Sequence, residues 1–324
     1  MKYIPPFKIT PLILKLSQDI SRELGLIIGR KLADTPLTLR RSNNIKSIQA
    51  SLAIEGNTLS LNQVTALLEG RRVIGPSKDI LEVQNAFILY EDLHRFNPLK
   101  VEDMLKAHAI LMAGLIEENG KWRTGGVGIL KGNEVSHIAP PAKRVPILME
   151  ELFNFLAHSS DISWLIKACI FHYEFEFIHP FSDGNGRMGR FWQQLLLMKE
   201  DALFEFIPVE VLIKQNQEEY YSVLGESDNL GESTPFIEFS LKVIYAALKD
   251  YSQTAARLPQ DHRTRLQFAQ ARIKENWFSR KDYLQLHPDI STATASRDLL
   301  FGLQEEILKN KGEKNQVKYQ FIKT

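Results

Sequence analysis

The chain of 324 residues is long enough for one large domain and a smaller one. Hydrophobic residues make up 44% and charged residues 24%, which is typical of a globular protein with a core of normal size. The 40 Lys and Arg nearly balance the 39 Asp and Glu, giving a net charge of +1. This balance excludes a general attraction for nucleic acid or acidic membranes, so any basic site must be local.

The N-terminus carries no targeting signal that we recognise. Residues 1–6 lack the apolar run of a secretory signal, and no later run approaches the length needed to span a membrane. The single cysteine, Cys169, cannot form an internal disulfide and lies in an apolar run, where we expect a small core residue. These features predict a cytoplasmic protein with no membrane partner.

Apolar residues recur at intervals of three and four along most of the chain, the period of amphipathic helices. The spacing of Ser60 and Gln63 is that of a capping box at a helix start. The pattern predicts an all-α architecture, with helices over residues 12–32, 39–54, 60–68, 79–95, 101–115, 146–157, 162–177, 187–199, 215–224 and 235–254.

The end of the second predicted helix holds a charged residue in an unusual place. Ser51 and Glu55 are four residues apart and share a helical face, and Gly56 is suited to end the helix. A carboxylate at a helix C-terminus is disfavoured by the helix dipole, so we expect Glu55 to have a cationic partner. The alternative is a surface glutamate at a helix end.

One segment interrupts the helical pattern. Residues 120–141 are rich in glycine and end in Pro140-Pro141, and apolar residues flank the sequence Lys131-Gly132-Asn133 on both sides. This pattern favours a β-hairpin with a glycine-containing turn, which we expect to be a surface flap.

Residues 179–190 form a glycine-rich loop that leads into a helix, with the sequence His-Pro-Phe-Ser-Asp-Gly-Asn-Gly-Arg-Met-Gly-Arg. Backbone N–H groups and the dipole at a helix start favour an anion, and Gly184 and Gly186 allow close approach of a phosphate. Arg187 and Arg190 share a helical face, and guanidinium groups suit bidentate phosphate binding. The loop therefore predicts a phosphate site.

Two further side chains of this loop supply the chemistry of phosphoryl or nucleotidyl transfer. Asp183 is a carboxylate among cations and is suited to hold Mg²⁺ together with phosphate oxygens. His179 is a titratable base next to the phosphate site. The loop contains no Gly-Lys-Ser/Thr, so it is not a P-loop.

Two alternatives remain open for the loop. In the first, His179 and Asp183 only cap helices around a turn. In the second, His172, Glu176 and His179 lie on one helical face and bind Zn²⁺ or Fe²⁺, as in a hydrolase. The second alternative leaves the phosphate site unexplained, and we expect His172 to be a packed polar residue.

The loop resembles the signature of the Fic family, His-x-Phe-x-Asp/Glu-Gly-Asn-Gly-Arg-x-x-Arg, and every fixed position is present. The resemblance extends over roughly residues 40–250. It implies an all-α Fic fold and a protein adenylyltransferase. In that reaction His179 deprotonates a Ser, Thr or Tyr of a target protein, and the hydroxyl attacks the α-phosphate of ATP.

The resemblance also implies roles for the other residues of the loop. Asp183 holds the Mg²⁺, while Arg187 and Arg190 bind the outer phosphates of ATP. The anion hole is formed by Gly184, Asn185 and Gly186.

A second resemblance concerns the helix at about residues 42–56, which is similar to the inhibitory helix of Fic proteins, Ser/Thr-x-x-x-Glu-Gly/Asn. It matches through Ser51 and Glu55, and it implies that Glu55 pairs with Arg190 in place of the γ-phosphate. The resemblance further implies that the same glutamate positions a water that removes AMP, so the direction of the reaction stays open.

The predicted hairpin, at about residues 123–138, resembles the family's flap, which holds the target protein by adding a strand. An ordinary hairpin is the alternative. Tyr220 and Tyr221 lie where related sequences have tyrosines near the adenine, and core packing is the alternative for this pair.

The chain divides into three predicted regions: an N-terminal helical region (1–100), a Fic core (101–258) and a C-terminal module (259–324). The last region contains predicted helices at 266–276, 280–286 and 292–304 and a hairpin around 311–314, an order that resembles a winged helix-turn-helix.

The C-terminal module is a candidate partner for DNA. Residues 260–324 hold twelve Lys or Arg against eight Asp or Glu, a net charge of +4. Asp298, on the predicted recognition helix, counts against DNA binding. The alternatives for this module are a packing element or a homodimer contact. If the module binds DNA, the rival to the enzyme is a DNA-binding regulator whose Fic core senses a nucleotide. Residue types that contact phosphates and base edges occur at Thr292, Thr294, Ser296 and Arg297.

Overall fold

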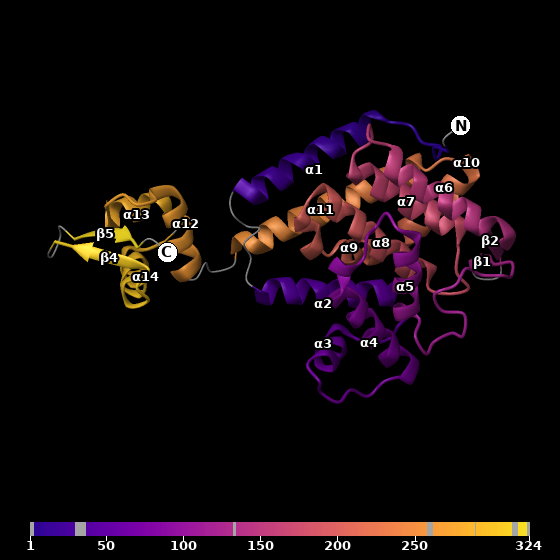
Figure 1. Cartoon of the computed structure of the whole chain (residues 1–324), viewed down its shortest axis with the longest axis horizontal. Helices are drawn as coiled ribbons and strands as arrows, with labels where there is room; N and C mark the ends of the chain where they lie inside the picture. Colours follow the sequence, from indigo (N-terminus) through magenta and orange to yellow (C-terminus); the bar gives the residue numbers. More distant parts are fainter. Residues whose placement is uncertain are drawn as a thin grey trace. The chain divides into compact units, whose positions relative to one another are not determined.

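The computed structural model describes residues 3–29, 37–131, 134–257, 262–288, 290–312 and 317–322. The chain forms two compact units, Met1–Gln253 and Thr254–Thr324, which are described separately (Figure 1). The sequence places a boundary near residue 258, and residues 258–261 lie outside the described part. In that part, no helix is long and apolar enough to cross a membrane.

The first unit is helical, which confirms the predicted all-α architecture. The prediction missed the short helix α9, which is only seven residues long and follows Pro208. The helices are α1 (Pro11–Gly29), α2 (Leu37–Ile54), α3 (Leu61–Leu68), α4 (Ser77–Glu91), α5 (Val101–Leu111), α6 (Val145–His158), α7 (Trp164–Ile178), α8 (Asn185–Glu200), α9 (Val209–Gln215), α10 (Gln217–Leu230) and α11 (Thr234–Arg257).

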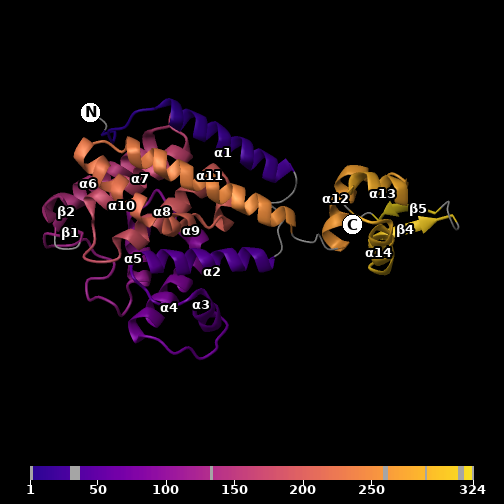
Figure 2. The same ribbon diagram turned by 180° about the vertical axis from the view of Figure 1, so that it is seen from behind.

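Helices α7 and α8 form the centre of this unit. α7 is buried on all sides, and Cys169 is one of its fully buried residues, as expected. Gly189 of α8 lets the two helices pack closely, because a Cβ there would lie 2.7 Å from Oε1 of Glu176. In both views α8 lies between α11 and α2 (Figure 2).

Helix α2 is fixed to the region around α9 by buried polar contacts. Ser47 donates to Oε2 of Glu210 at 2.7 Å, and Asn43 donates to the Phe206 carbonyl at 3.0 Å. The loop after α2 leads to the predicted capping box, which is present: Ser60 accepts from the Gln63 N–H and Gln63 accepts from the Ser60 N–H. The contacts of Ser47 and Asn43 fix α2 against the segment that contains α9.

The predicted hairpin is also present in this unit. Strands β1 (Gly128–Lys131) and β2 (Glu134–Ile138) pair antiparallel, with Lys131 opposite Glu134. Gly132 and Asn133 of the predicted turn lie outside the described residues.

The second unit contains α12 (His262–Ile273), β3 (Phe278–Ser279), α13 (Arg280–Leu286), α14 (Thr292–Gln304), β4 (Leu308–Lys311) and β5 (Lys318–Phe321). The strands form an antiparallel sheet in the order β3-β5-β4. The three helices and the C-terminal hairpin follow the predicted order, and the assignment as a winged helix-turn-helix stays a prediction. The two-residue strand β3 is too short to be predicted from a pattern.

A buried carboxylate joins the three helices of this unit. Asp298 of α14 is fully buried and accepts from Nε and Nη2 of Arg265 in α12 at 2.5 and 2.6 Å. It also contacts His262 at 2.6 Å and accepts from the Tyr283 hydroxyl at 3.2 Å. Burial would raise the pKa of Asp298, but the bonds from Arg265 and His262 outweigh it and lower the pKa. The charge that counted against a DNA-binding surface is therefore inside the core.

Replacement of Asp298 by Ala leaves the Arg265 guanidinium buried without its carboxylate, which costs about 3–5 kcal/mol. We expect the unfolding transition of the C-terminal unit to move to lower urea concentration in the full-length chain. Glu305→Ala is the control, because the pair of Glu305 with Arg263 is exposed and is worth less than about 1 kcal/mol. Equal shifts for the two variants would contradict the proposed stabilising role of Asp298.

Candidate active site

The predicted loop of residues 179–190 is a tight turn between α7 and α8. α7 ends at His179, whose backbone is left-handed with φ 49° and ψ 61° and whose N–H bonds to the Phe175 carbonyl at 2.9 Å. Gly184 has φ 83°, and a Cβ there would lie 2.7 Å from Sδ of Met112. A glycine is therefore required where the turn enters α8.

The side chain of Asn185 closes this turn. Its Oδ1 accepts from the Phe181 N–H and its Nδ2 donates to the Phe181 carbonyl, both at 2.9 Å. The resemblance placed Asn185 in the anion hole. The side chain of Asn185 therefore holds the loop, and its backbone N–H and the second N–H of Nδ2 are the donors it has left for an anion.

His108 of α5 packs against the turn and bonds to it. The sequence analysis did not identify this residue. Its ring stacks on Phe181 with centroids 3.6 Å apart. Nδ1 accepts from the Gly120 N–H at 2.8 Å, so Nε2 carries the proton and donates to the Asp183 carbonyl at 3.0 Å. Burial is the main cause that lowers the pKa of His108, to about 4, so the ring is neutral near pH 7.

Arg187 lies between two carboxylates. Its Nη2 donates to Oδ1 of Asp183 at 2.9 Å, and its Nη1 donates to Oε1 of Glu82 in α4 at 3.1 Å. Glu82, which the sequence analysis missed, also accepts from Asn57 Nδ2 at 2.8 Å, just beyond the end of α2. The buried guanidinium therefore links the turn to the segment that carries Glu55.

Asp183 offers a single carboxylate for a metal. Its side chain is 47% exposed, and the described residues hold no group of three or more His, Cys, Asp or Glu suited to bind a metal on their own. This donor set fits a Mg²⁺ ion that arrives with phosphate oxygens and keeps several waters, rather than a resident metal held by protein side chains alone.

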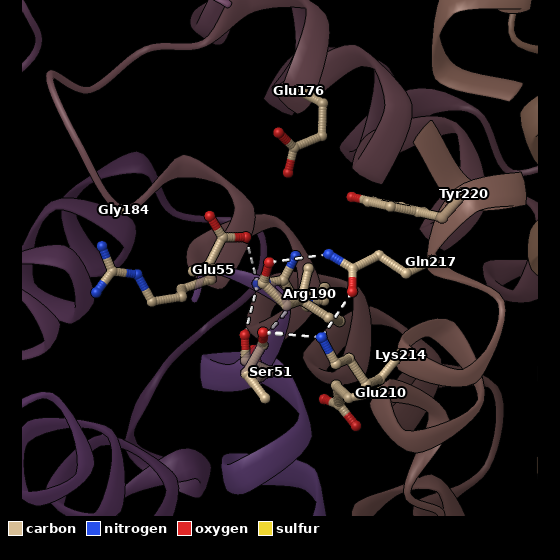
Figure 3. A network of polar contacts seen from close by, with 12 residues as sticks. Ser51, Glu55, Glu176, Gly184, Arg190, Glu210, Lys214, Gln217 and Tyr220 are labelled. Carbon is tan, nitrogen blue, oxygen red and sulfur yellow. Dashed lines mark hydrogen bonds and ion pairs between the residues drawn. The ribbon is translucent and has the colours of Figure 1, made fainter. Parts of the chain in front are cut away.

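Arg190 is almost fully buried and contacts the inhibitory helix predicted from the sequence (Figure 3). Its Nη2 donates to Oε1 of Glu55 at 2.8 Å and to the Ser51 carbonyl at 3.0 Å, and its Nε donates to the Ser51 hydroxyl at 3.1 Å. Burial alone would lower the pKa of Arg190, but the charge of Glu55 outweighs it and raises the pKa. The expected contact of Glu55 with Arg190 is present.

Gly186 shows where the Glu55 carboxylate lies. A Cβ at Gly186 would overlap Oε1 of Glu55, and it would lie 3.1 Å from Nη1 of Arg190. The carboxylate therefore rests against the first turn of α8, at the helix end that attracts anions. This is the position where the sequence predicts a phosphate.

The C-terminal end of α2 is held by side chains of α9 and α10 that the sequence did not reveal. Lys214 donates to the Ala53 carbonyl at 3.0 Å, and Gln217 donates to the Ile54 carbonyl at 3.1 Å. Lys214 also donates to the Gln217 Oε1 at 2.6 Å, so the two side chains act together. A cation at these terminal carbonyls offsets the unfavourable position of Glu55 at a helix C-terminus.

The structure separates the two predicted adenine-site tyrosines. Tyr220 is 1% exposed and its hydroxyl lies 3.1 Å from Nε2 of His172, so it is a core residue, which was the alternative. Tyr221 is 41% exposed, with its hydroxyl 3.5 Å from the Ile54 carbonyl, and its role remains a prediction.

His172 has no place in a metal site. Its Nδ1 lies 2.8 Å from Oε1 of Gln193, its Nε2 faces Tyr220, and the ring is fully buried. Burial is the main cause that lowers its pKa, to about 3. Both nitrogens are thus used in the core, as expected for a packed polar residue.

Comparisons with known proteins place this turn in a family. Residues 98–197 match the family described as Fic/DOC. A Fic family protein from Desulfovibrio desulfuricans G20 has a crystal structure that is 38% identical in sequence, with a TM-score of 0.75 over 99% of each chain. Fic-1 from C. elegans is 25% identical, with a TM-score of 0.60 over 76% of this chain and 74% of that structure.

Helical architecture and the His179–Arg190 turn together define a protein with the Fic fold. This chain belongs to the Fic family, since the Desulfovibrio relative matches it over nearly its full length.

The curated relatives carry the name of an enzyme. Protein adenylyltransferase fic-1 of Caenorhabditis elegans is 32% identical over 62% of this chain and 40% of that protein. Protein adenylyltransferase Fic of Nematostella vectensis is 30% identical over 67% of this chain and 51% of that protein. The chain therefore spans about half or less of the length of these relatives.

The depressed pKa of His108 leads to a prediction about stability. The unfolded chain binds a proton at this residue below pH 6.5, whereas the folded chain does so only near pH 4. The contribution of neutral His108 to the free energy of unfolding is complete above pH 6.5. It falls as the pH decreases from 6.5 to 4, by at most about 1.4 kcal/mol per pH unit.

His108→Gln keeps a donor for Asp183 but removes this titration, so we expect a shallower loss of stability over the same pH range. The measurement is urea unfolding at a series of pH values. The exposed His158→Gln serves as the control variant. An unchanged pH slope in His108→Gln would mean that His108 does not titrate in this range.

Proposed function

We propose that this protein is an adenylyltransferase that transfers AMP from ATP to a Ser, Thr or Tyr hydroxyl of a target protein. The observation that carries the proposal is the carboxylate of Glu55 bound to Arg190 at the start of α8, because it marks a preformed anion site. The names of the curated relatives support the choice of reaction.

The chemistry follows from the residues around that site. The oxygen of the target hydroxyl forms a bond to the α-phosphorus of ATP, and the bond from that phosphorus to the oxygen bridging to the β-phosphate breaks. Pyrophosphate leaves, and the hydroxyl proton goes to His179, the base of the turn. Gly184 and Gly186 admit the phosphates, and Arg190 is positioned to neutralise the outermost one.

A Mg²⁺ ion bound with ATP would neutralise charge on the phosphates, and Asp183 would hold it. Arg187 donates to Oδ1 of Asp183 at 2.9 Å and so fixes that carboxylate relative to α8. In this role Arg187 orients Asp183, in addition to any contact with phosphate that the resemblance implies.

The contact of Glu55 with Arg190 restrains this reaction. A single guanidinium cannot serve the Glu55 carboxylate and a γ-phosphate fully, and both anions require the same space over Gly186. Nucleotide therefore binds in a productive pose only when the end of α2 withdraws Glu55. Lys214 and Gln217 stabilise the restrained state because they hold that end of α2.

Removal of the Glu55 carboxylate should increase nucleotide binding and self-modification. A charge-assisted hydrogen bond contributes about 1.5–3 kcal/mol, so we expect Glu55→Gly to bind ATP about 10- to 100-fold more tightly. The measurements are calorimetry with Mg-ATP and labelling with α-³²P-ATP, with His179→Ala in the Glu55→Gly background as the inactive partner.

Glu69→Gly is the matched control, because Glu69 is exposed and pairs only with the nearby Arg71 among the described contacts. No gain of label in Glu55→Gly would contradict the transferase. Loss of label from a pre-modified protein, without any gain, would indicate the reverse reaction, and nucleotide binding without either would indicate a sensor.

We also infer that the C-terminal unit binds duplex DNA. The observation that favours it is the burial of Asp298, which leaves Arg297 as the charged residue on the exposed side of α14, together with Thr292, Ala293 and Leu300 and the partly exposed Thr294 and Ser296. Arg280 adds a second guanidinium next to α14, since its Nη1 lies 3.0 Å from the Ser296 hydroxyl. On β4, Lys311 lies 4.0 Å from the ring of Trp277 and adds charge to the wing. Cations around a helix that exposes small polar residues suit a major groove.

Arg297→Ala should weaken binding of the full-length chain to a fluorescent duplex of random sequence. Loss of one phosphate contact also lowers the slope of log affinity against log salt by about 1. Lys15→Ala, an exposed residue of α1, is the control. Absence of binding at low salt, or an unchanged slope in Arg297→Ala, would contradict this assignment.

A further inference from the structure

Arg123 is a buried arginine whose side chain bonds to backbone carbonyls. It is 3% exposed and lies in the loop before strand β1. Its Nε donates to the His179 carbonyl at 2.7 Å, and its Nη2 donates to the Ile178 carbonyl at 3.2 Å. These two carbonyls are the end of α7, where the helix dipole favours a cation.

The same guanidinium reaches both ends of the hairpin. Nη1 donates to the Gly125 carbonyl at 2.8 Å, and Nη2 donates to the Pro140 carbonyl at 2.5 Å. Gly125 precedes β1 and Pro140 follows β2, so both stems of the hairpin meet at this one side chain. The Ala139 N–H closes the base of the hairpin by donating to the Val127 carbonyl at 3.3 Å.

The chain next to Arg123 is fastened to the turn as well. The Arg123 N–H donates to the Pro180 carbonyl at 2.9 Å, and the ring of Trp122 lies 5.0 Å from the ring of Phe181. The base of the hairpin and the turn that carries His179 are therefore attached to each other by side-chain and backbone bonds.

The geometry requires a guanidinium in particular. The planar group presents five N–H donors in a fixed fork, which allows it to bond four carbonyls that lie in different directions. A lysine ammonium has three donors at one point and cannot reach all four. Burial lowers the pKa of Arg123, because the charge is held away from water.

We infer that Arg123 is a positioning residue for AMP transfer: it sets the distance between a target hydroxyl held on the hairpin and the His179 base. The inference rests on the proposed function and on the hairpin as the docking site of the target. The bonds of Arg123 end on the hairpin and on residues 178–180, and none involves Asp183, Gly184 or the first turn of α8, so ATP binding does not depend directly on this link. Loss of the link should therefore affect the rate of transfer and not the affinity for nucleotide.

The test compares Arg123→Lys with its parent, the full-length Glu55→Gly variant. We expect the initial rate of self-labelling at saturating α-³²P-ATP to fall by about 100-fold, the cost of a displacement of about 1 Å between reacting groups. The dissociation constant of Mg-ATP, measured by calorimetry, should stay within twofold of the parent. Arg144→Lys, an exposed arginine just after the hairpin, is the control and should label like the parent.

Hydrogen exchange provides a readout that does not depend on activity. In Arg123→Lys the Ala139 amide should exchange faster than in the parent, while the amides of α8 keep their protection. Unchanged labelling would overturn the inference while leaving the proposed function intact. A joint loss of labelling, ATP binding and α8 protection would also overturn it, since Arg123 would then be required for folding. A parent that does not label would contradict the proposed function itself, and unchanged exchange at Ala139 would then refute the link as well.

Discussion

The structure of the site depends on one buried guanidinium. Arg190, a residue of α8, is 2% exposed, and its guanidinium lies against the first turn of the same helix. Its buried charge therefore needs an anion at that point. Glu55 supplies one from α2, and the outer phosphate of a nucleotide is the other candidate. The folded structure therefore holds a carboxylate at the start of α8, where the outer phosphate of ATP binds in the proposed reaction. Under that proposal, restraint and catalysis are two occupancies of the same electrostatic site, and the position of α2 decides between them.

The remaining residues of the site divide into a fixed part and an exchangeable part. His108 and Arg123 hold the turn from two sides through its backbone carbonyls, at Asp183 and at His179. These contacts involve no anion and need not change when nucleotide binds. Glu55, by contrast, is held in two exchangeable ways. Its side chain forms an ion pair with Arg190, and the carbonyls at the end of its helix accept hydrogen bonds from Lys214 and Gln217. A rigid turn next to an exchangeable anion fits the proposed enzyme, in which the end of α2 switches the activity.

The sequence predicts those parts of the site that are local. The turn is a continuous segment, and the spacing of Ser51 and Glu55 predicts a shared helical face, so both could be identified. His108 and Arg123 could not, because their partners are backbone carbonyls 75 and 56 residues away and no local pattern marks them. Burial also decides two points that the sequence left open. Tyr220 and Asp298 each satisfy a partner inside a core, which a pattern of residue types cannot show.

Gly186 bears on both the restraint by Glu55 and the proposed binding of phosphate. A side chain at this position would overlap the Glu55 carboxylate. Under the proposed function the γ-phosphate needs the same space, so a substitution there would remove the restraint and the activity together. The strength of the restraint can then be adjusted only from α2 or from Lys214 and Gln217, which hold its end.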